Sequence, residues 1–157
     1  MTVVRAAVEV ESPPEGVWEV IADPRNLPMW DRHIESVEDL PEGGLRVGTR
    51  YVTVLRLMRV HAHVTTEVIE LDPPRLGVFH VSGLLEATIT TRIEELARGR
   101  SLLQHEVDYK FPMGALGRLA ARSLRIMGGA GFMLRHGTLA QKRQIEARRG
   151  AFPEDVA

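Results

Sequence analysis

Apolar and polar residues alternate along most of the chain before residue 112, and this pattern predicts a sheet. The first strand covers 4–10, where an apolar residue occupies every second position. Six further runs with strand character cover 33–40, 48–59, 59–71, 76–81, 87–93 and 103–111. Short connections containing Pro, Gly or Asp separate these runs, so consecutive strands should be antiparallel neighbours.

Helical spacing interrupts the strand pattern between the first two strands. Ser12 is a candidate cap for a helix with Pro14 at its first position, and the apolar face of this helix lies at 17–21. Asp23 precedes a proline and is a candidate cap for a second short helix that ends near Trp30. We therefore expect two small helices directly after the first strand.

The last third of the chain, from Gly114 to Arg149, has the apolar spacing of a helix. The residues of its first apolar face recur at steps of three and four: Leu116, Leu119, Ala120, Leu124 and Met127. Gly128, Gly129 and Gly131 lie in its middle, and each costs up to about 1 kcal/mol relative to Ala inside a helix. We therefore expect two helical segments or an end that projects beyond the sheet.

The predicted order is strand, two helices, six strands and a long helix, which is an α+β fold class. We expect residues 1–150 to form one domain and residues 151–157 to form a flexible C-terminal tail. A chain of 157 residues buries about two thirds of the surface that its unfolded form exposes. Such a domain needs no disulfide for stability, and this chain has no Cys.

The absence of Cys excludes thiolate catalysis and Cys-ligated metals, and it fits a reducing compartment. The start of the chain has no apolar core of signal-peptide length. No apolar run reaches the roughly 18 residues of a membrane-spanning helix. We therefore expect a cytoplasmic protein with no integral membrane segment.

The net charge of −1 hides an uneven distribution. Residues 115–150 hold eight Arg or Lys and one acid, Glu146, a balance of +7, so the remaining residues hold 12 bases and 20 acids, a balance of −8. One interpretation is a solvated face with cations near a helix C-terminus. The alternative is an interaction surface for a partner, an acidic membrane or a second copy of the chain. Nucleic acid is not expected, because few aromatic residues are available for stacking.

Two groups of polar residues are candidates for chemistry. His105 shares the inward row of its strand with Tyr109, and histidine titrates near neutral pH, although a hydrogen-bonded core histidine is the alternative. Arg122 lies closest to the apolar stripe of the last helix and could bind an oxyanion, or it could simply extend into solvent. His61 and His63 lack a third ligand, so no metal site is predicted.

An apolar cavity between sheet and helix is expected to bind a ligand. The predicted lining residues are Trp30, Tyr51, Leu55, Ile89, His105, Tyr109, Met113, Leu119, Met127 and Leu134. Three other apolar residues are interpreted as plain core: Trp18, Val107 and Leu124. Nucleophile elbows, phosphate loops and dinucleotide fingerprints do not occur, so no cofactor is predicted.

Three segments carry a resemblance to a known superfamily. They are Ser12 to Asp23 with Leu27 to Asp31, Glu70 to Arg75, and Tyr109 to Leu119. In these segments the chain resembles the SRPBCC or START-like superfamily, which includes polyketide cyclases and aromatases, lipid-transfer START domains and the birch-pollen allergen. The resemblance implies the helix-grip fold, a seven-stranded antiparallel sheet curled around the long C-terminal helix, with a hydrophobic cavity between them. The glycine cluster at 128–131 departs from this pattern.

Three functions follow as hypotheses. The leading one is binding of a small hydrophobic molecule, such as a lipid, a polyketide or another aromatic natural product. The second is a cofactor-independent enzyme resembling polyketide cyclases or aromatases, in which His105 or Tyr109 moves protons and Arg122 stabilises an enolate. The third is an interaction protein that uses the basic C-terminal helix, for which a homodimer is one arrangement.

Overall fold

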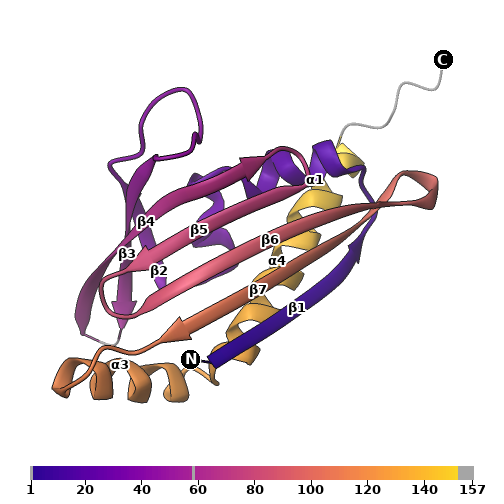
Figure 1. Ribbon diagram of the computed structural model, residues 1–157. Coiled ribbons are helices and arrows are strands. Elements are labelled where there is room, and N and C mark those ends of the chain that lie inside the picture. The colour runs from indigo at the N-terminus through magenta and orange to yellow at the C-terminus, as the bar shows by residue number, and fades with distance from the viewer. Residues whose placement is uncertain (1, 58, 152–157) are drawn as a thin grey trace.

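The computed structural model describes residues 2–57 and 59–151. Within them, seven strands form one antiparallel sheet with the spatial order β1-β7-β6-β5-β4-β3-β2 (Figure 1). The strands are β1 (Thr2–Val10), β2 (Ile34–Glu38), β3 (Arg50–Leu57), β4 (Val60–Asp72), β5 (Leu76–Ser82), β6 (Glu86–Leu96) and β7 (Arg100–Lys110). The first and second strands of the chain are therefore the two edges of the sheet.

Helices connect these two edges and close the chain. Between β1 and β2 lie α1 (Pro14–Ile21), the 3-10 turn η1 (Pro24–Asn26) and α2 (Leu27–Trp30). A second 3-10 turn, η2 (Ala97–Gly99), joins β6 to β7, and the chain ends with α3 (Ala115–Ile126) and α4 (Ala130–Ala151). The predicted tail lies outside the described residues beyond Ala151. No helix in the described part is both long enough and apolar enough to cross a membrane.

This architecture confirms the predicted α+β helix-grip class. The sheet curves, and α4 runs along its inner side, where it packs against β1, α1 and α2 (Figure 1). The sheet curls because each strand twists in the same sense relative to its neighbour. Because α4 touches the edge strand and the two connecting helices, it is held at one side of the curved sheet, and space remains over the central strands.

The predicted break in the long helix is confirmed at the glycine cluster. The backbone N–H of Gly128 donates to the carbonyl of Arg125 at 3.2 Å, and that of Gly129 donates to the carbonyl of Leu124 at 2.9 Å. The two glycines have φ angles of 98° and 87°. Residues with a side chain adopt such positive φ angles only at a cost in free energy that glycine does not have. This is the Schellman arrangement that ends a helix, so α3 stops at Ile126 and α4 begins in a new direction.

A compact apolar core fills the end of the sheet that α1 covers. Its buried members are Val10, Val17, Val20, Trp30, Ile93, Leu103 and Ile145. They come from β1, β6, β7, α1, α2 and α4, so one cluster joins both layers. Leu103 and Val17 are fully buried. This end of the structure is solid, whereas the opposite end, near α3, is not.

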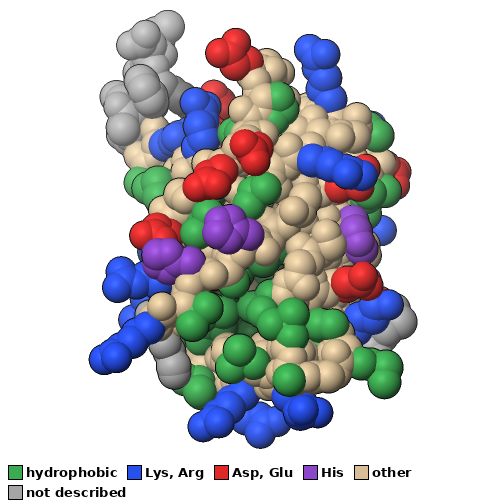
Figure 2. All heavy atoms as spheres, turned by 90° about the vertical axis from the view of Figure 1, so that its left-hand side faces the viewer, with side chains coloured by type: hydrophobic (Ala, Val, Ile, Leu, Met, Phe, Trp, Pro, Cys, Tyr) green, Lys and Arg blue, Asp and Glu red, His purple; other side chains and the backbone are tan. Residues whose placement is uncertain are grey.

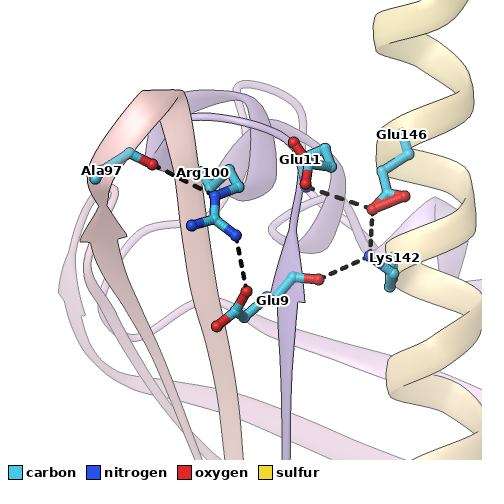
Figure 3. A network of polar contacts seen from close by, with 6 residues as sticks. All are labelled: Glu9, Glu11, Ala97, Arg100, Lys142 and Glu146. Carbon is cyan, nitrogen blue, oxygen red and sulfur yellow. Dashed lines mark hydrogen bonds and ion pairs between the residues drawn. The ribbon is translucent and has the colours of Figure 1, made fainter.

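Polar contacts fix α4 to the edge strand β1 (Figure 3). The Lys142 ammonium donates to the carbonyl oxygen of Glu9 at 2.8 Å and pairs with Glu146. The Glu146 carboxylate also accepts the backbone N–H of Glu11 at 3.4 Å, and Arg100 from β7 pairs with the Glu9 side chain at 3.0 Å. These contacts hold the C-terminal half of α4, so its N-terminal half is positioned as a rigid cover over the sheet.

One predicted helix cap is wrong and the other is confirmed. The residue before α1 is Pro13, whose carbonyl accepts the N–H of Val17, whereas the Ser12 hydroxyl donates to the Pro13 carbonyl instead of capping the helix. The carbonyl of Ser12 is engaged by Ser101, which fixes this residue to the sheet. Asp23 accepts the backbone N–H of Arg25 and caps the next turn as predicted.

Candidate functional site

A cavity of about 390 Å³ lies between the sheet and α4 at the end that the core leaves open. In Figure 2, hydrophobic side chains surround a hollow on this side of the molecule, with Arg and Lys side chains along the lower edge. Every strand of the sheet and the helices α1, α2, α3 and α4 contribute to the wall. The volume lies within the range of small-molecule sites.

The strand period explains which residues form the floor of the cavity. On β7, His105, Val107 and Tyr109 line the cavity, and on β6, Ile89 and Thr91 do so. Successive side chains of a strand point to opposite faces, so residues two apart share the concave face. The antiparallel register places Thr91 opposite His105 and Ile89 opposite Val107. Two polar side chains, those of Thr91 and His105, therefore meet on this part of the floor.

The cover of the cavity comes from one face of α4. Leu134, Thr138 and Gln141 line it at helical steps of four and three, and Ile145 continues the same face into the core. The face thus changes from apolar to polar and back to apolar along the helix. Gln141 is the residue of this face that reaches His105 on β7.

Thr91, His105 and Gln141 form a buried hydrogen-bonded group across the sheet and the helix. The Nδ1 atom of His105 lies 2.8 Å from the Thr91 hydroxyl, and its Nε2 atom lies 2.7 Å from Oε1 of Gln141. Because the Gln141 oxygen can only accept, Nε2 carries the proton and Nδ1 accepts from Thr91. Burial lowers the pKa of His105, against a smaller opposite effect of the Gln141 hydrogen bond. The imidazole is therefore neutral at pH 7.

Tyr51 is a second buried polar group in the wall. Desolvation raises the pKa of its phenol to about 12, and a hydrogen bond with Thr66 opposes this rise. The phenol therefore keeps its proton across the physiological range and cannot act there as a base. Thr66 and Thr53 line the cavity close to it on β4 and β3. The wall also includes the Asp31 carboxylate, which lies 2.8 Å from Nδ1 of His33.

Seven of the ten predicted lining residues lie on the cavity wall. They are Trp30, Tyr51, Leu55, Ile89, His105, Tyr109 and Leu134. Trp30 is also fixed from outside the cavity, because its indole N–H donates to Oε1 of Gln144 on α4 at 2.6 Å. What the structure establishes for these residues is their position, from which a role in ligand binding is proposed below.

The other three predicted lining residues lie elsewhere. Met113 is 98% exposed and Leu119 is 55% exposed, and Met127 is half-buried away from the wall. The reason is the direction in which α3 leaves the glycine break: its buried side carries Gly117 and Ala120. The expected packing of the whole apolar stripe on the sheet is therefore wrong for α3.

Three residues that the sequence assigned to plain core line the cavity instead. Trp18 from α1, Val107 from β7 and Leu124 from α3 all contribute to its wall. Leu124 is the one member of α3 that does so. The sequence shows the apolar character of these residues, but no sequence signal separates a core position from a cavity wall.

Arg122 does not join His105 and Tyr109. It lies on the exposed side of α3 and outside the cavity wall. Since Arg122 precedes Leu124 by two residues, the two side chains leave nearly opposite sides of the helix, and Leu124 takes the side that faces the cavity. The predicted constellation of three catalytic residues is therefore not assembled.

The histidine pair on β4 remains a surface feature. His61 and His63 are exposed, and Nε2 of His61 lies 3.5 Å from a carboxylate oxygen of Glu35. Within residues 2–57 and 59–151, no three His, Cys, Asp or Glu side chains are grouped so that they could hold a metal ion.

Sequence reasoning missed the polar contribution of α4 and part of the wall on β5. Gln141 could have been found from its spacing, because it follows the predicted wall residue Leu134 by seven positions on one helical face. Phe79 and Val81 on β5 follow the strand period in the same way. Strand period puts Thr91 on the same face as Ile89, but its hydrogen bond to His105 depends on strand register.

A wider recess of about 830 Å³ adjoins the cavity beside α1. The segment 37–45 forms one of its sides, and the two hollows share Trp18, Ala22, Pro24 and Leu45. Its charged residues include Asp23 and Arg25, which pair with each other at 2.8 Å. The more apolar cavity between the sheet and α4 is therefore the stronger candidate for a ligand site.

Comparison with solved structures places this geometry among related folds. The chain is similar to an aromatase/cyclase, Zhui, from Streptomyces sp. R1128, with 19% identity, a TM-score of 0.72 and 99% of each chain covered. It is similar to a START superfamily protein from Mycobacterium smegmatis, with 15% identity, a TM-score of 0.69, and 93% of this chain and 98% of that chain covered. At these identities the similarity establishes the fold.

A norcoclaurine synthase from Thalictrum flavum, solved as a point mutant with a transition state analogue, is also similar. The identity is 15%, the TM-score is 0.66, and 94% of this chain and 96% of that chain are covered. Comparison with curated protein sequences gives no significant match. The family model described as polyketide cyclase / dehydrase and lipid transport matches residues 1–131. The resemblance found in the sequence is confirmed, and the chain belongs to this polyketide cyclase / dehydrase and lipid transport family.

Proposed function

We propose that the chain binds a small, largely apolar molecule in the cavity between the sheet and α4. The observation that carries this proposal is the cavity of about 390 Å³, whose wall is mostly aliphatic and aromatic and holds few polar groups. Sites of this size and composition are those that proteins use for small molecules. Burial of the ligand's apolar surface would supply most of the affinity.

The polar groups favour a ligand with one hydrogen-bonding oxygen. Oε1 of Gln141 accepts from His105, and the side-chain amide nitrogen has no partner in the described part of the chain. The Tyr109 hydroxyl likewise has no partner there. An unused donor beside an apolar wall matches a carbonyl or hydroxyl oxygen on an otherwise apolar ligand, because such an oxygen would otherwise lose its bonds to water.

Ligand binding is tested by filling the cavity. Leu134→Trp places an indole in the wall, whereas Leu119→Trp places the same group on the exposed side of α3. An apolar fluorescent dye should saturate at one site per chain in the wild type and in Leu119→Trp, and should raise the melting temperature of both. Leu134→Trp should lose both effects while its circular dichroism stays native. Equal binding by all three proteins would contradict the proposal.

The polar part of the proposal has a separate test. Gln141→Leu should weaken binding of an aromatic ketone by about tenfold, the value of roughly one hydrogen bond, and should leave binding of the matching hydrocarbon unchanged. Mass spectrometry of any small molecule that co-purifies with the folded chain would identify the natural ligand class. A loss of affinity that is equal for ketone and hydrocarbon would contradict a role for Gln141 as the donor.

A second candidate function is cyclisation or dehydration of a polycarbonyl substrate in the same cavity. Its support is that His105 and Tyr109 lie on one face of β7 and both border the cavity. Arg122 has no part in it, and proton transfer at His105 would require exchange of one of its two hydrogen bonds. This function would be supported if the wild type converts a polyketone to product and Tyr109→Phe still binds the polyketone but no longer converts it. Unchanged turnover in that variant would exclude it.

A further inference from the structure

A second surface of the chain has the character of a binding site and lies outside the cavity. We define the α3 apolar patch as five side chains that are each more than half exposed: Met113, Leu116, Leu119, Ile126 and Phe132. Phe132 joins the patch because its ring lies over Gly128 at the end of α3. Large apolar side chains gathered on a surface indicate an interaction site, since each of them is poorly hydrated.

The patch has a defined place on α3. Helical spacing puts Leu119 and Ile126 in a sector between the buried side, which carries Ala120, and a row of cations. The cations of this row are all exposed: Arg118, Arg122 and Arg125. No ion pair to them occurs within residues 2–57 and 59–151. The helix therefore presents an apolar sector and a cationic sector side by side.

The segment that carries the patch has charge of one sign. No Asp or Glu occurs between Asp108 and Glu146. In Figure 2, Arg and Lys side chains line the lower edge of the molecule, directly below the hydrophobic side chains. Of the eight bases in residues 115–150, Arg118, Arg122, Arg125 and Arg135 lie on α3 or the first turns of α4, whereas the other four lie on the C-terminal half of α4. An anionic surface would therefore meet four cations and no acid on the segment from α3 to the start of α4.

The combination selects one kind of partner. In a symmetric dimer through this face, each copy would present the same three arginines to the other, which is repulsive. Nucleic acid would satisfy the arginines but would leave Leu and Ile side chains against a charged backbone. A bilayer with anionic headgroups satisfies both sectors, because the apolar side chains enter the acyl boundary and the arginines contact phosphate.

We propose that α3 docks on the surface of an anionic lipid bilayer through the α3 apolar patch and its three arginines. The helix then lies parallel to the membrane plane, with Leu119 and Ile126 inserted. Leu124, two residues before Ile126 and so on nearly the opposite side of the helix, lines the cavity, so the docked helix would lie between the bilayer and the cavity. The proposal concerns the surface of α3 and does not depend on what the cavity binds.

Vesicle flotation tests the cationic sector. The wild-type chain should float with vesicles of phosphatidylcholine and phosphatidylglycerol, should not float with pure phosphatidylcholine, and should detach as salt is raised. Each cation near an anionic surface contributes about fivefold to the partition coefficient. Reversal of the three arginines to Glu should therefore lower the partition coefficient by roughly 100-fold or more. Absence of wild-type binding to the mixed vesicles, or binding unchanged by the reversal, would overturn the proposal.

A matched control separates location from net charge. Arg46, Arg92 and Arg143 are exposed and lie outside α3, on a loop, on β6 and on α4. Their reversal to Glu changes the net charge of the chain by the same amount. This control should bind the mixed vesicles within about threefold of the wild type, since charges far from the surface are screened. A loss as large as that of the α3 variant would overturn the proposal.

The apolar sector has its own test. Leu119→Ser with Ile126→Ser should lower the partition coefficient by at least roughly tenfold, because two large side chains no longer enter the bilayer. Retention on heparin, which offers anions without an acyl layer, should be unchanged. If the two serine substitutions leave vesicle binding unchanged, the chain binds the vesicles through charge alone, and docking by insertion is contradicted. Native circular dichroism and unchanged dye binding in the cavity confirm that each variant is folded.

Discussion

The Nε2 atom of His105 on β7 lies 2.7 Å from Oε1 of Gln141 on α4, and both side chains are buried. This hydrogen bond joins the floor of the cavity to its cover. It also determines the protonation of the site, because a neutral imidazole with a proton on Nε2 satisfies both Gln141 and Thr91. The polar end of the cavity is thus a preorganised neutral group.

The first prediction concerns the free energy of unfolding. Gln141→Leu leaves the Nε2–H group of His105 without its acceptor, so we expect a loss of about 1–3 kcal/mol in urea unfolding. Gln104→Leu is the matched control, because Gln104 occupies the neighbouring position on β7, where side chains leave the opposite face. The control should stay within about 0.5 kcal/mol of the wild type. Equal losses in the two variants would show that the hydrogen bond contributes nothing specific.

The second prediction concerns pH. Since burial depresses the pKa of His105 below its ordinary value of 6.5, the unfolded chain binds this proton more readily than the folded one. The contribution of His105 to stability is therefore complete above pH 6.5 and is lost as the pH falls below that value towards the folded pKa. His105→Gln should remove this part of the slope. If the unfolding free energies of the wild type and the variant change in parallel below pH 6.5, the predicted contribution of His105 is contradicted.

The third prediction compares a buried leucine on β7 with an exposed leucine on α3. Leu103 is fully buried in the core, so Leu103→Ala should cost about 2–5 kcal/mol through lost burial and a new void. Leu119 on α3 is largely exposed, and Leu119→Ala should change stability by less than about 0.5 kcal/mol. Urea unfolding measures both. A large loss in Leu119→Ala would mean that α3 is buried more deeply than the structure has it.

The fourth prediction concerns the start of α3. A Cβ atom at Gly117 would lie 1.6 Å from the carbonyl oxygen of Pro112, so Gly117→Ala must displace the first turn of the helix. At Gly131 the nearest atom is the flexible end of Arg135, at 3.3 Å, so Gly131→Ala should be neutral or stabilise by up to about 1 kcal/mol. Thermal unfolding should show a lower melting temperature for the first variant alone. A Gly117→Ala protein as stable as the wild type would refute the close contact.

The sequence by itself determined the elements and much of the site. Strand period alone places His105, Val107 and Tyr109 on one face, because alternation is a local property of an extended backbone. Gly128 and Gly129 ended the helix where expected, because their left-handed backbone suits glycine. For these features the physical cause lies within a few residues of the chain, so the sequence carries it.

The tertiary structure decided everything that depends on direction and distance. The bend after Ile126 turned Leu119 and Met113 to solvent and left Leu124 on the cavity wall, and nothing local specifies the angle of that bend. Gln141 and His105 meet across 36 residues of sequence, through the packing of α4 on the sheet. Side chains with the same apolar spacing thus became core, cavity wall or exposed patch, because only long-range packing settles what each one faces.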